Sequence, residues 1–197
     1  MKFEEFVQKY DYPGSVVLLE GKRDVAEGDK EKLTELGRLL ARSTQYMMFR
    51  SGNAEGADDL FCTGAAEYAK DRMQLVVPYS GHRKKYIRGI ETHSADEIDY
   101  AAEPQIAYNA TRQNKNNKMI ERYLAGHRDR STIKASYLIR DTIKVTGTGK
   151  IGPAAFAIYY DDLKNPESGG TGFTMGVCRS NQVPFIDQRV WMGWLYS

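Results

Sequence analysis

The 197-residue sequence is poor in metal-binding side chains, with two cysteines and three histidines. Cys62 and Cys178 form neither a Cys-x-x-Cys pair nor a zinc-ligand spacing, and the histidines share no ligand spacing with cysteines or carboxylates. Metal binding is therefore not expected, and both cysteines are predicted to be reduced, buried residues of helices. No apolar run approaches the roughly 20 residues that cross a bilayer. We expect a cytoplasmic protein with no membrane segment and no resident cofactor.

Neither sign of charge is in excess, because 28 basic side chains face 26 acidic ones, a formal net charge of +2. This balance argues against a polycationic surface of the kind that marks obligate nucleic-acid binders. Any basic function must be local. One cluster follows the third predicted strand and comprises His82, Arg83, Lys84, Lys85 and Arg88. It could close over phosphates, as could Arg140 from a later helix, or it could be ordinary solvated surface.

What the sequence does contain is three glycine-bearing loops, each placed after an apolar run. The loops span residues 21–24, 51–58 and 167–174, and the runs before them are residues 15–19, 46–49 and 154–160. The first two loops lead into segments of helical periodicity. In parallel α/β sheets such loops gather at the carboxyl ends of the strands, where backbone N–H groups and helix N-termini favour phosphate. The pattern favours a nucleotide-like ligand.

The periodicity predicts the rest of the fold. Residues 15–78 follow a β-α-β-α-β order, whereas residues 79–150 show helix-like patterns and no clear strand. We therefore predict an α/β fold: a Rossmann-like, doubly wound, mainly parallel sheet of about five strands with helices on both faces. A helical insertion of about residues 80–150 separates strands three and four. A single domain covers residues 1–197, and the aromatic tail, residues 191–196, packs on the body or on a second subunit.

The ordered loops resemble the SLOG superfamily, which includes the Rossmann-like domain of DprA and the LOG-type phosphoribohydrolases. The resemblance is carried by Gly-Lys-Arg at 21–23, Ser-Gly-Asn-Ala-Glu-Gly-Ala-Asp at 51–58 and Gly-Gly-Thr-Gly at 169–172. It spans roughly residues 15–187. It implies a nucleotide-binding Rossmannoid domain and, by analogy with related folds, a homo-oligomer.

One departure limits what the resemblance implies. LOG-type hydrolases carry a glutamate shortly after the Gly-Gly-x-Gly turn, whereas here the chain continues Phe173-Thr174-Met175-Gly176. Without that carboxylate, hydrolysis of nucleoside monophosphates does not carry over. The resemblance supports binding more than catalysis, and whether the protein is an enzyme stays open.

Several candidate ligand contacts have structural alternatives. Arg23 could bind phosphate or pair with Asp24 or Asp58, and Asp58 could cap its helix or accept a ribose hydroxyl. Asn53 could serve only as a left-handed turn residue, and the glycines of the third loop could serve only a turn. The predicted ligand-binding residues are Gly21, Lys22, Arg23, Ser51, Gly52, Asn53, Glu55, Gly56, Asp58, Gly169, Gly170, Thr171, Gly172 and Thr174.

Three functions are compatible with this pattern. The leading hypothesis is a sensor or sequestering protein that binds a nucleotide or a nucleotide derivative, such as an ADP-ribose-like molecule. The second is a hydrolase of such molecules that uses Glu55, Asp58 or Glu167 as an acid or base. The third is DprA-like binding of single-stranded nucleic acid, which the near-neutral charge disfavours.

Overall fold

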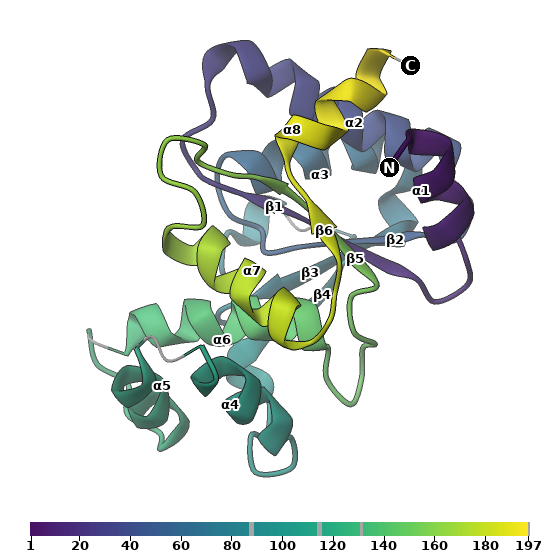
Figure 1. The fold of residues 1–197 in the computed structure, drawn as a ribbon. Helices are drawn as coiled ribbons and strands as arrows, with labels where there is room; N and C mark the ends of the chain where they lie inside the picture. The colour runs from purple at the N-terminus through teal and green to yellow at the C-terminus, as the bar shows by residue number, and fades with distance from the viewer. Residues whose placement is uncertain (87–88, 114–115, 131, 197) are drawn as a thin grey trace.

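The computed structural model describes residues 1–86, 89–113, 116–130 and 132–196. Within these residues the core is a six-stranded parallel sheet in the order β4-β3-β2-β1-β5-β6 (Figure 1). The strands are β1 (Val16–Gly21), β2 (Met48–Ser51), β3 (Met73–Val77), β4 (Glu91–Ser94), β5 (Phe156–Tyr160) and β6 (Phe185–Ile186). Strands β2, β3 and β4 follow one another on one side of β1, and β5 and β6 lie on the other side. The strand order therefore changes direction at β1.

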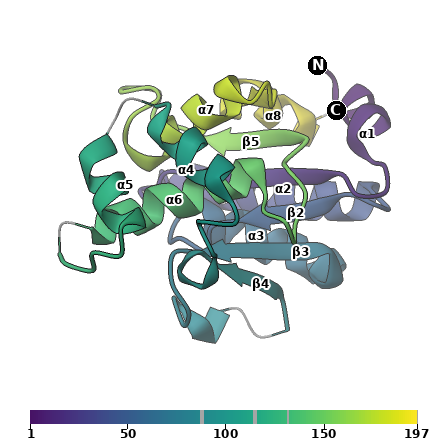
Figure 2. The same cartoon turned by 90° about the horizontal axis from the view of Figure 1, so that it is seen from below.

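Helices cover both faces of the sheet (Figures 1 and 2). One face carries α1 (Phe3–Tyr10), α2 (Lys30–Ser43), α3 (Ala57–Ala69) and α8 (Gln188–Trp191). The other carries α4 (Pro104–Thr111), α5 (Asn117–Leu124), α6 (Ile133–Thr146) and α7 (Gly169–Ser180). Short 3-10 turns lie at Glu27–Asp29, Lys70–Arg72, Lys84–Tyr86, Ala95–Glu97 and Met192–Tyr196. The predicted doubly wound α/β architecture is confirmed.

The alternation of β1 decides which side chains reach each face. Val17 and Leu19 are fully buried in the core beneath α2 and α3, whereas Leu18 is buried in the core beneath α6 and α7. Successive side chains of a strand point to opposite faces, so Glu20 lies on the same face as Leu18. This places a carboxyl group at the end of β1, against α6 and α7.

The aromatic tail packs on the body of the same chain. Trp191 is fully buried, its indole N–H donates to the Tyr159 carbonyl at 2.8 Å, and Trp194 lies against Phe6. The sequence left open whether the tail packs on the body or on a second subunit, and the structure supports packing on the body.

The sequence did not predict β4. Its residues, Glu91-Thr92-His93-Ser94, are polar or partly exposed at the sheet edge, and they pair in parallel with β3. An exposed edge strand needs no apolar run, so the usual signal is missing. The helical segment therefore lies between β4 and β5. Cys178 is buried as predicted, Cys62 is only half-buried, and both are free thiols. None of the described helices combines the length and the apolar character that crossing a bilayer requires.

Candidate functional site

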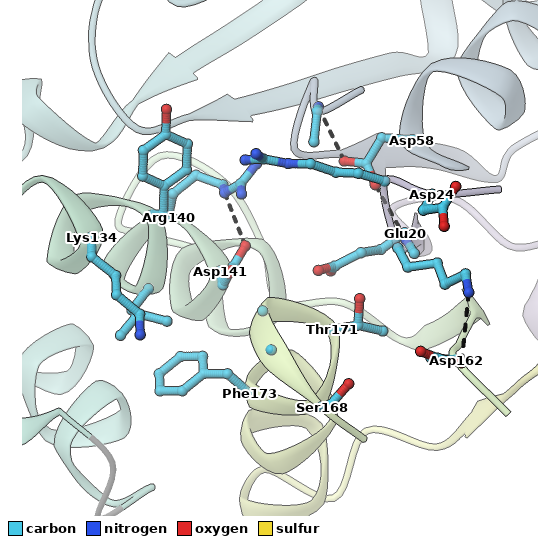
Figure 3. A pocket seen from close by; sticks show the side chains of 18 of the residues that line it. Glu20, Asp24, Asp58, Lys134, Arg140, Asp141, Asp162, Ser168, Thr171 and Phe173 are labelled. Atoms are coloured by element: carbon cyan, nitrogen blue, oxygen red, sulfur yellow. Dashed lines mark hydrogen bonds and ion pairs between the residues drawn. The ribbon is translucent and has the colours of Figure 1, made fainter. Parts of the chain in front are cut away.

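A cavity of about 990 Å³ opens at the carboxyl ends of β1 and β5 (Figure 3). The loop after β1, the start of α3, the inner face of α6 and the first turn of α7 contribute its walls. In an open α/β sheet this is the topological switch point, where the loops from adjacent strands diverge and leave a crevice. The fold itself therefore creates the cavity.

Asp58 joins two of the glycine loops. Its carboxylate accepts the backbone N–H groups of Gly21 at 3.2 Å and Gly52 at 3.1 Å, and the side chain is almost fully buried. Both oxygens are thus engaged by the chain, and neither contact is made with the first turn of its own helix. Asp58 holds the loops after β1 and β2 in register at the cavity wall.

Four buried charged side chains cluster at the cavity floor. Glu20 from β1 and Arg140 and Asp141 from α6 line the cavity, and Lys144 of α6 contacts the two acids without lining it. The Lys144 Nζ lies 2.7 Å from Glu20 Oε2 and 2.9 Å from Asp141 Oδ1. Arg140 pairs with Asp141 at 2.9 Å and donates from Nη1 to the Gly52 carbonyl at 2.6 Å. Opposite charges are required here because a single buried ion would be strongly destabilising.

The floor has perturbed proton equilibria. Burial raises the pKa of Glu20 to about 7, an effect that the charge of Lys144 opposes and the charge of Asp141 reinforces. Burial lowers the pKa of Lys144, but the charges of Asp141 and Glu20 outweigh this and leave it above the ordinary value. Glu20 can therefore exchange a proton near neutral pH.

The first turn of α7 faces the floor from the other side. Glu20, Asp141 and Thr171 point into the same space in Figure 3. A Cβ added at Gly170 would find only Asp141 Oδ2, at 3.5 Å, and one at Gly169 would meet nothing within 4 Å. The first N–H groups of an α-helix have no acceptor within the helix and carry its positive end. This turn presents open backbone to the cavity.

The rim of the cavity is richer in cations than the floor. Lys22 and Arg23 come from the loop after β1, Arg130 comes from the segment before α6, and Lys134 comes from the first turn of α6. The Lys22 Nζ lies 3.6 Å from Asp162 Oδ1, and Asp24 is the other acidic side chain of the rim. The cations of the floor are matched by the acids of the floor. An anion that enters the cavity would therefore be attracted mainly by the rim cations and by the N-terminus of α7.

The structure brings eight of the predicted residues to the cavity: Gly21, Lys22, Arg23, Asp58, Gly169, Gly170, Thr171 and Arg140. The other predicted residues do not line it: Ser51, Gly52, Asn53, Glu55, Gly56, Gly172, Thr174, Arg83 and Lys84.

Packing accounts for three glycines that are not in the cavity wall. A Cβ on Gly52 would lie 2.0 Å from Arg140 Nη1, and one on Gly172 would lie 1.7 Å from the Glu167 carbonyl oxygen. Gly56 has φ +86°, and a Cβ there would lie 2.1 Å from the Arg23 carbonyl oxygen. These glycines permit close approach of the chain to itself, and they shape the loops whether or not a ligand binds.

Some predicted polar residues point elsewhere. The Arg83 guanidinium pairs with Asp59 at 2.6 Å, and Asn53, at φ +52°, donates to the His82 carbonyl at 3.3 Å. Lys84 is exposed. Thr174 is buried, with its hydroxyl 3.0 Å from both the Gly170 carbonyl and Glu20 Oε1. Arg88 lies outside the described residues.

Sequence reasoning missed most of α6 and the end of β1. The additional residues of the cavity are Glu20, Asp24, Ala54, Asn116, Arg130, Ile133, Lys134, Tyr137, Leu138, Asp141, Asp162, Ser168 and Phe173. A usable signal existed for the floor. Glu20 interrupts an otherwise apolar strand, and Asp141 and Lys144 fall three residues apart on the buried side of a helix.

Comparison with known proteins adds a likeness of fold. No protein-family model matches the chain, and neither does any curated protein. Among solved structures, DNA processing protein A from Helicobacter pylori, studied for its single-stranded DNA binding mode, is similar with a TM-score of 0.49 and 19% identity. The likeness covers 91% of this chain and 67% of that chain. The sheet order and the helices on both faces define the present protein as a Rossmann-like α/β protein.

Proposed function

We propose that this protein binds a nucleotide or a nucleotide-derived small molecule in the cavity at the carboxyl ends of β1 and β5. The observation that carries the proposal is the open first turn of α7 at Gly169 and Gly170, facing cations of the β1 loop across a cavity of about 990 Å³. Helix N-termini with glycine backbone are ready anion sites. A phosphate is the anion that this arrangement suits.

The acidic floor fits the sugar of such a ligand. Carboxylates are hydrogen-bond acceptors, and acidic residues bind ribose hydroxyls in dinucleotide folds. Glu20 and Asp141 face the space next to α7, so a ribose attached to the bound phosphate would meet them. The rim cations thus suit the anionic end of the ligand, and the floor carboxylates suit its hydroxyl-bearing end.

Isothermal titration with AMP tests the proposal on wild type and on Gly170→Ala. The added methyl group has room, since its nearest neighbour would be Asp141 Oδ2 at 3.5 Å, and alanine favours a helix, so the fold should persist. The methyl group would occupy the place of the phosphate, and we expect the affinity to fall by about tenfold or more. Gly28→Ala, where a Cβ meets nothing within 4 Å and which lies outside the cavity, is the matched control.

Equal AMP affinity in wild type and Gly170→Ala would contradict the proposed anion site. So would a wild type that ignores AMP and binds a short oligonucleotide with an affinity that collapses on addition of salt, because that behaviour indicates contacts to a nucleic-acid backbone.

A second candidate function is hydrolysis of the bound nucleotide, favoured by Glu20. The carboxylates considered from sequence are not placed for it: Asp58 is held by backbone amides, Glu167 pairs with Arg179, and Glu55 does not line the cavity. Glu20 does line it, and burial raises its pKa to about 7, near the optimum for a general acid or base. Water would add to C1′ as the bond to the base nitrogen breaks, and the base would leave with a proton. Chromatography of AMP incubated with wild type and Glu20→Gln tests this, since release of adenine by wild type alone is required.

A further inference from the structure

A second cavity of about 520 Å³ adjoins the proposed nucleotide site. The two share Arg130, Ile133 and Tyr137 in their walls, so they meet along the first turns of α6. The second cavity is distinguished by its aromatic lining, which adds Tyr79 and Tyr123 to Tyr137. The main cavity, in contrast, has one tyrosine and one phenylalanine.

Two of the rings that line this second cavity pack nearly perpendicular to the ring of His82. His82 lies between Tyr79 and Tyr137, with ring centroids 5.1 Å and 5.8 Å apart and interplanar angles of 83° in both pairs. Tyr79 is 42% exposed and Tyr137 is half-buried. Edge-to-face packing fixes ring orientation without covering both faces. Tyr79 and Tyr137 are therefore preoriented aromatic surfaces.

Cations complete the lining. The Arg128 guanidinium lies 4.0 Å from the centroid of the Tyr123 ring, and Arg130 lines both cavities. On the side of the main cavity, Arg140 lies 5.6 Å from the centroid of the Tyr137 ring. Tyrosine faces flanked by arginines are the surfaces on which nucleic-acid bases stack.

We propose that the second cavity is the subsite for the aromatic base of the bound nucleotide. The inference rests on the proposed function, and it assigns the ligand class as a 5′-nucleotide that spans both cavities. The phosphate lies at α7, and the ribose lies between the floor carboxylates and the shared wall at Tyr137. The base stacks against Tyr137 or Tyr79. The base follows the sugar into the second cavity because the shared wall at Tyr137 is where the two spaces meet.

The test compares AMP with ribose 5-phosphate, which keeps the phosphate and sugar and lacks the base. Isothermal titration of wild type should give an affinity about tenfold or more higher for AMP, since base stacking on an aromatic side chain supplies that difference. Tyr137→Leu and Tyr79→Leu should lose much of the AMP preference while they retain affinity for ribose 5-phosphate. Tyr108→Leu, at a side chain 61% exposed on α4 and outside both cavities, is the control and should behave as wild type.

The outcomes separate this subsite from the anion site. Ribose 5-phosphate bound as tightly as AMP by wild type would overturn the base subsite and leave the phosphate site standing. Equal losses for both ligands in the two leucine variants would overturn it as well, because such losses indicate a structural role. If wild type binds neither ligand, the proposed function falls together with the subsite. If Tyr137→Leu does not fold, Tyr79→Leu decides the test: a lost AMP preference with retained ribose 5-phosphate affinity supports the subsite, and an AMP preference equal to that of wild type overturns it.

Discussion

The amino group of Lys144 lies 2.7 Å from the carboxylate of Glu20, and both side chains are buried beneath the candidate site. The contact ties the end of β1 to α6 at the floor of the cavity. The Lys144 Nζ also lies 2.9 Å from Asp141 Oδ1, so one buried cation forms ion pairs with two carboxylates. Such an arrangement depends on pH, because burial disfavours the ionised form of each partner.

Glu20 should make the stability of the protein fall as pH rises from 4.5 to about 7, the interval between its ordinary and native pKa values. In this interval the native state keeps a proton on Glu20 that the unfolded chain has released. The unfolded state then binds fewer protons, and the free energy of unfolding decreases with pH. Urea unfolding across the interval should show this component in wild type and in the exposed control Glu4→Gln. If the same fall in the free energy of unfolding between pH 4.5 and about 7 persists in Glu20→Gln, it does not come from Glu20.

Asp58→Asn should destabilise the protein by about 1 to 3 kcal/mol, because the Gly21 and Gly52 N–H groups donate to different carboxylate oxygens and an amide keeps only one of them. The other N–H group would then face an NH2 donor. Hydrogen exchange followed by NMR should show faster exchange at these two amides than in wild type. Asp71→Asn, at an exposed aspartate, is the control and should leave both rates unchanged. Unchanged exchange in Asp58→Asn would mean that the loops are held by other contacts.

Two glycines of α7 should respond oppositely to alanine. Gly172→Ala places a Cβ 1.7 Å from the Glu167 carbonyl oxygen, and we expect a loss of about 3 kcal/mol through overpacking. Gly170→Ala has space and should be neutral or stabilise by up to about 1 kcal/mol through helix propensity. Urea unfolding midpoints provide the comparison. A more stable Gly172→Ala would refute the packing explanation for this glycine.

Arg23→Gln should weaken binding of ribose 5-phosphate by about tenfold, because a hydrogen bond to a charged group is lost at the rim. Stability should change little, since Arg23 is exposed. Arg42→Gln removes an exposed arginine from α2, outside the cavity, and serves as the control for net charge. An equal loss in both variants would indicate a general charge effect instead of a contact at the site.

The fold was predictable because its signals are local. The apolar runs at residues 15–19 and 154–160 correspond to β1 and β5, and the helix-like patterns of residues 79–150 contain the observed helices α4, α5 and α6. The loops could be placed at one edge of the sheet by topology alone. The strand β4 was not predictable, because a polar edge strand has no apolar signature.

The site was predictable only where the glycine loops form it. Gly169 and Gly170 line the cavity, whereas Gly52 and Gly172 are explained by the close approach of Arg140 and of the Glu167 backbone. A sequence does not distinguish these two uses of glycine. The α6 wall, with Tyr137 and Asp141, required the three-dimensional path of a helix from the segment that least matched any motif. The ligand-binding role of the predicted residues stays a prediction.

Titration of ¹⁵N-labelled protein with AMP, followed by amide chemical shifts, tests the central claim most directly. The account predicts saturable shifts at Gly169, Gly170 and Thr171 in the first turn of α7 and at Lys22 and Arg23 in the loop after β1. Shifts confined to residues outside the cavity, or none at saturating AMP, would contradict a nucleotide site at the carboxyl ends of β1 and β5.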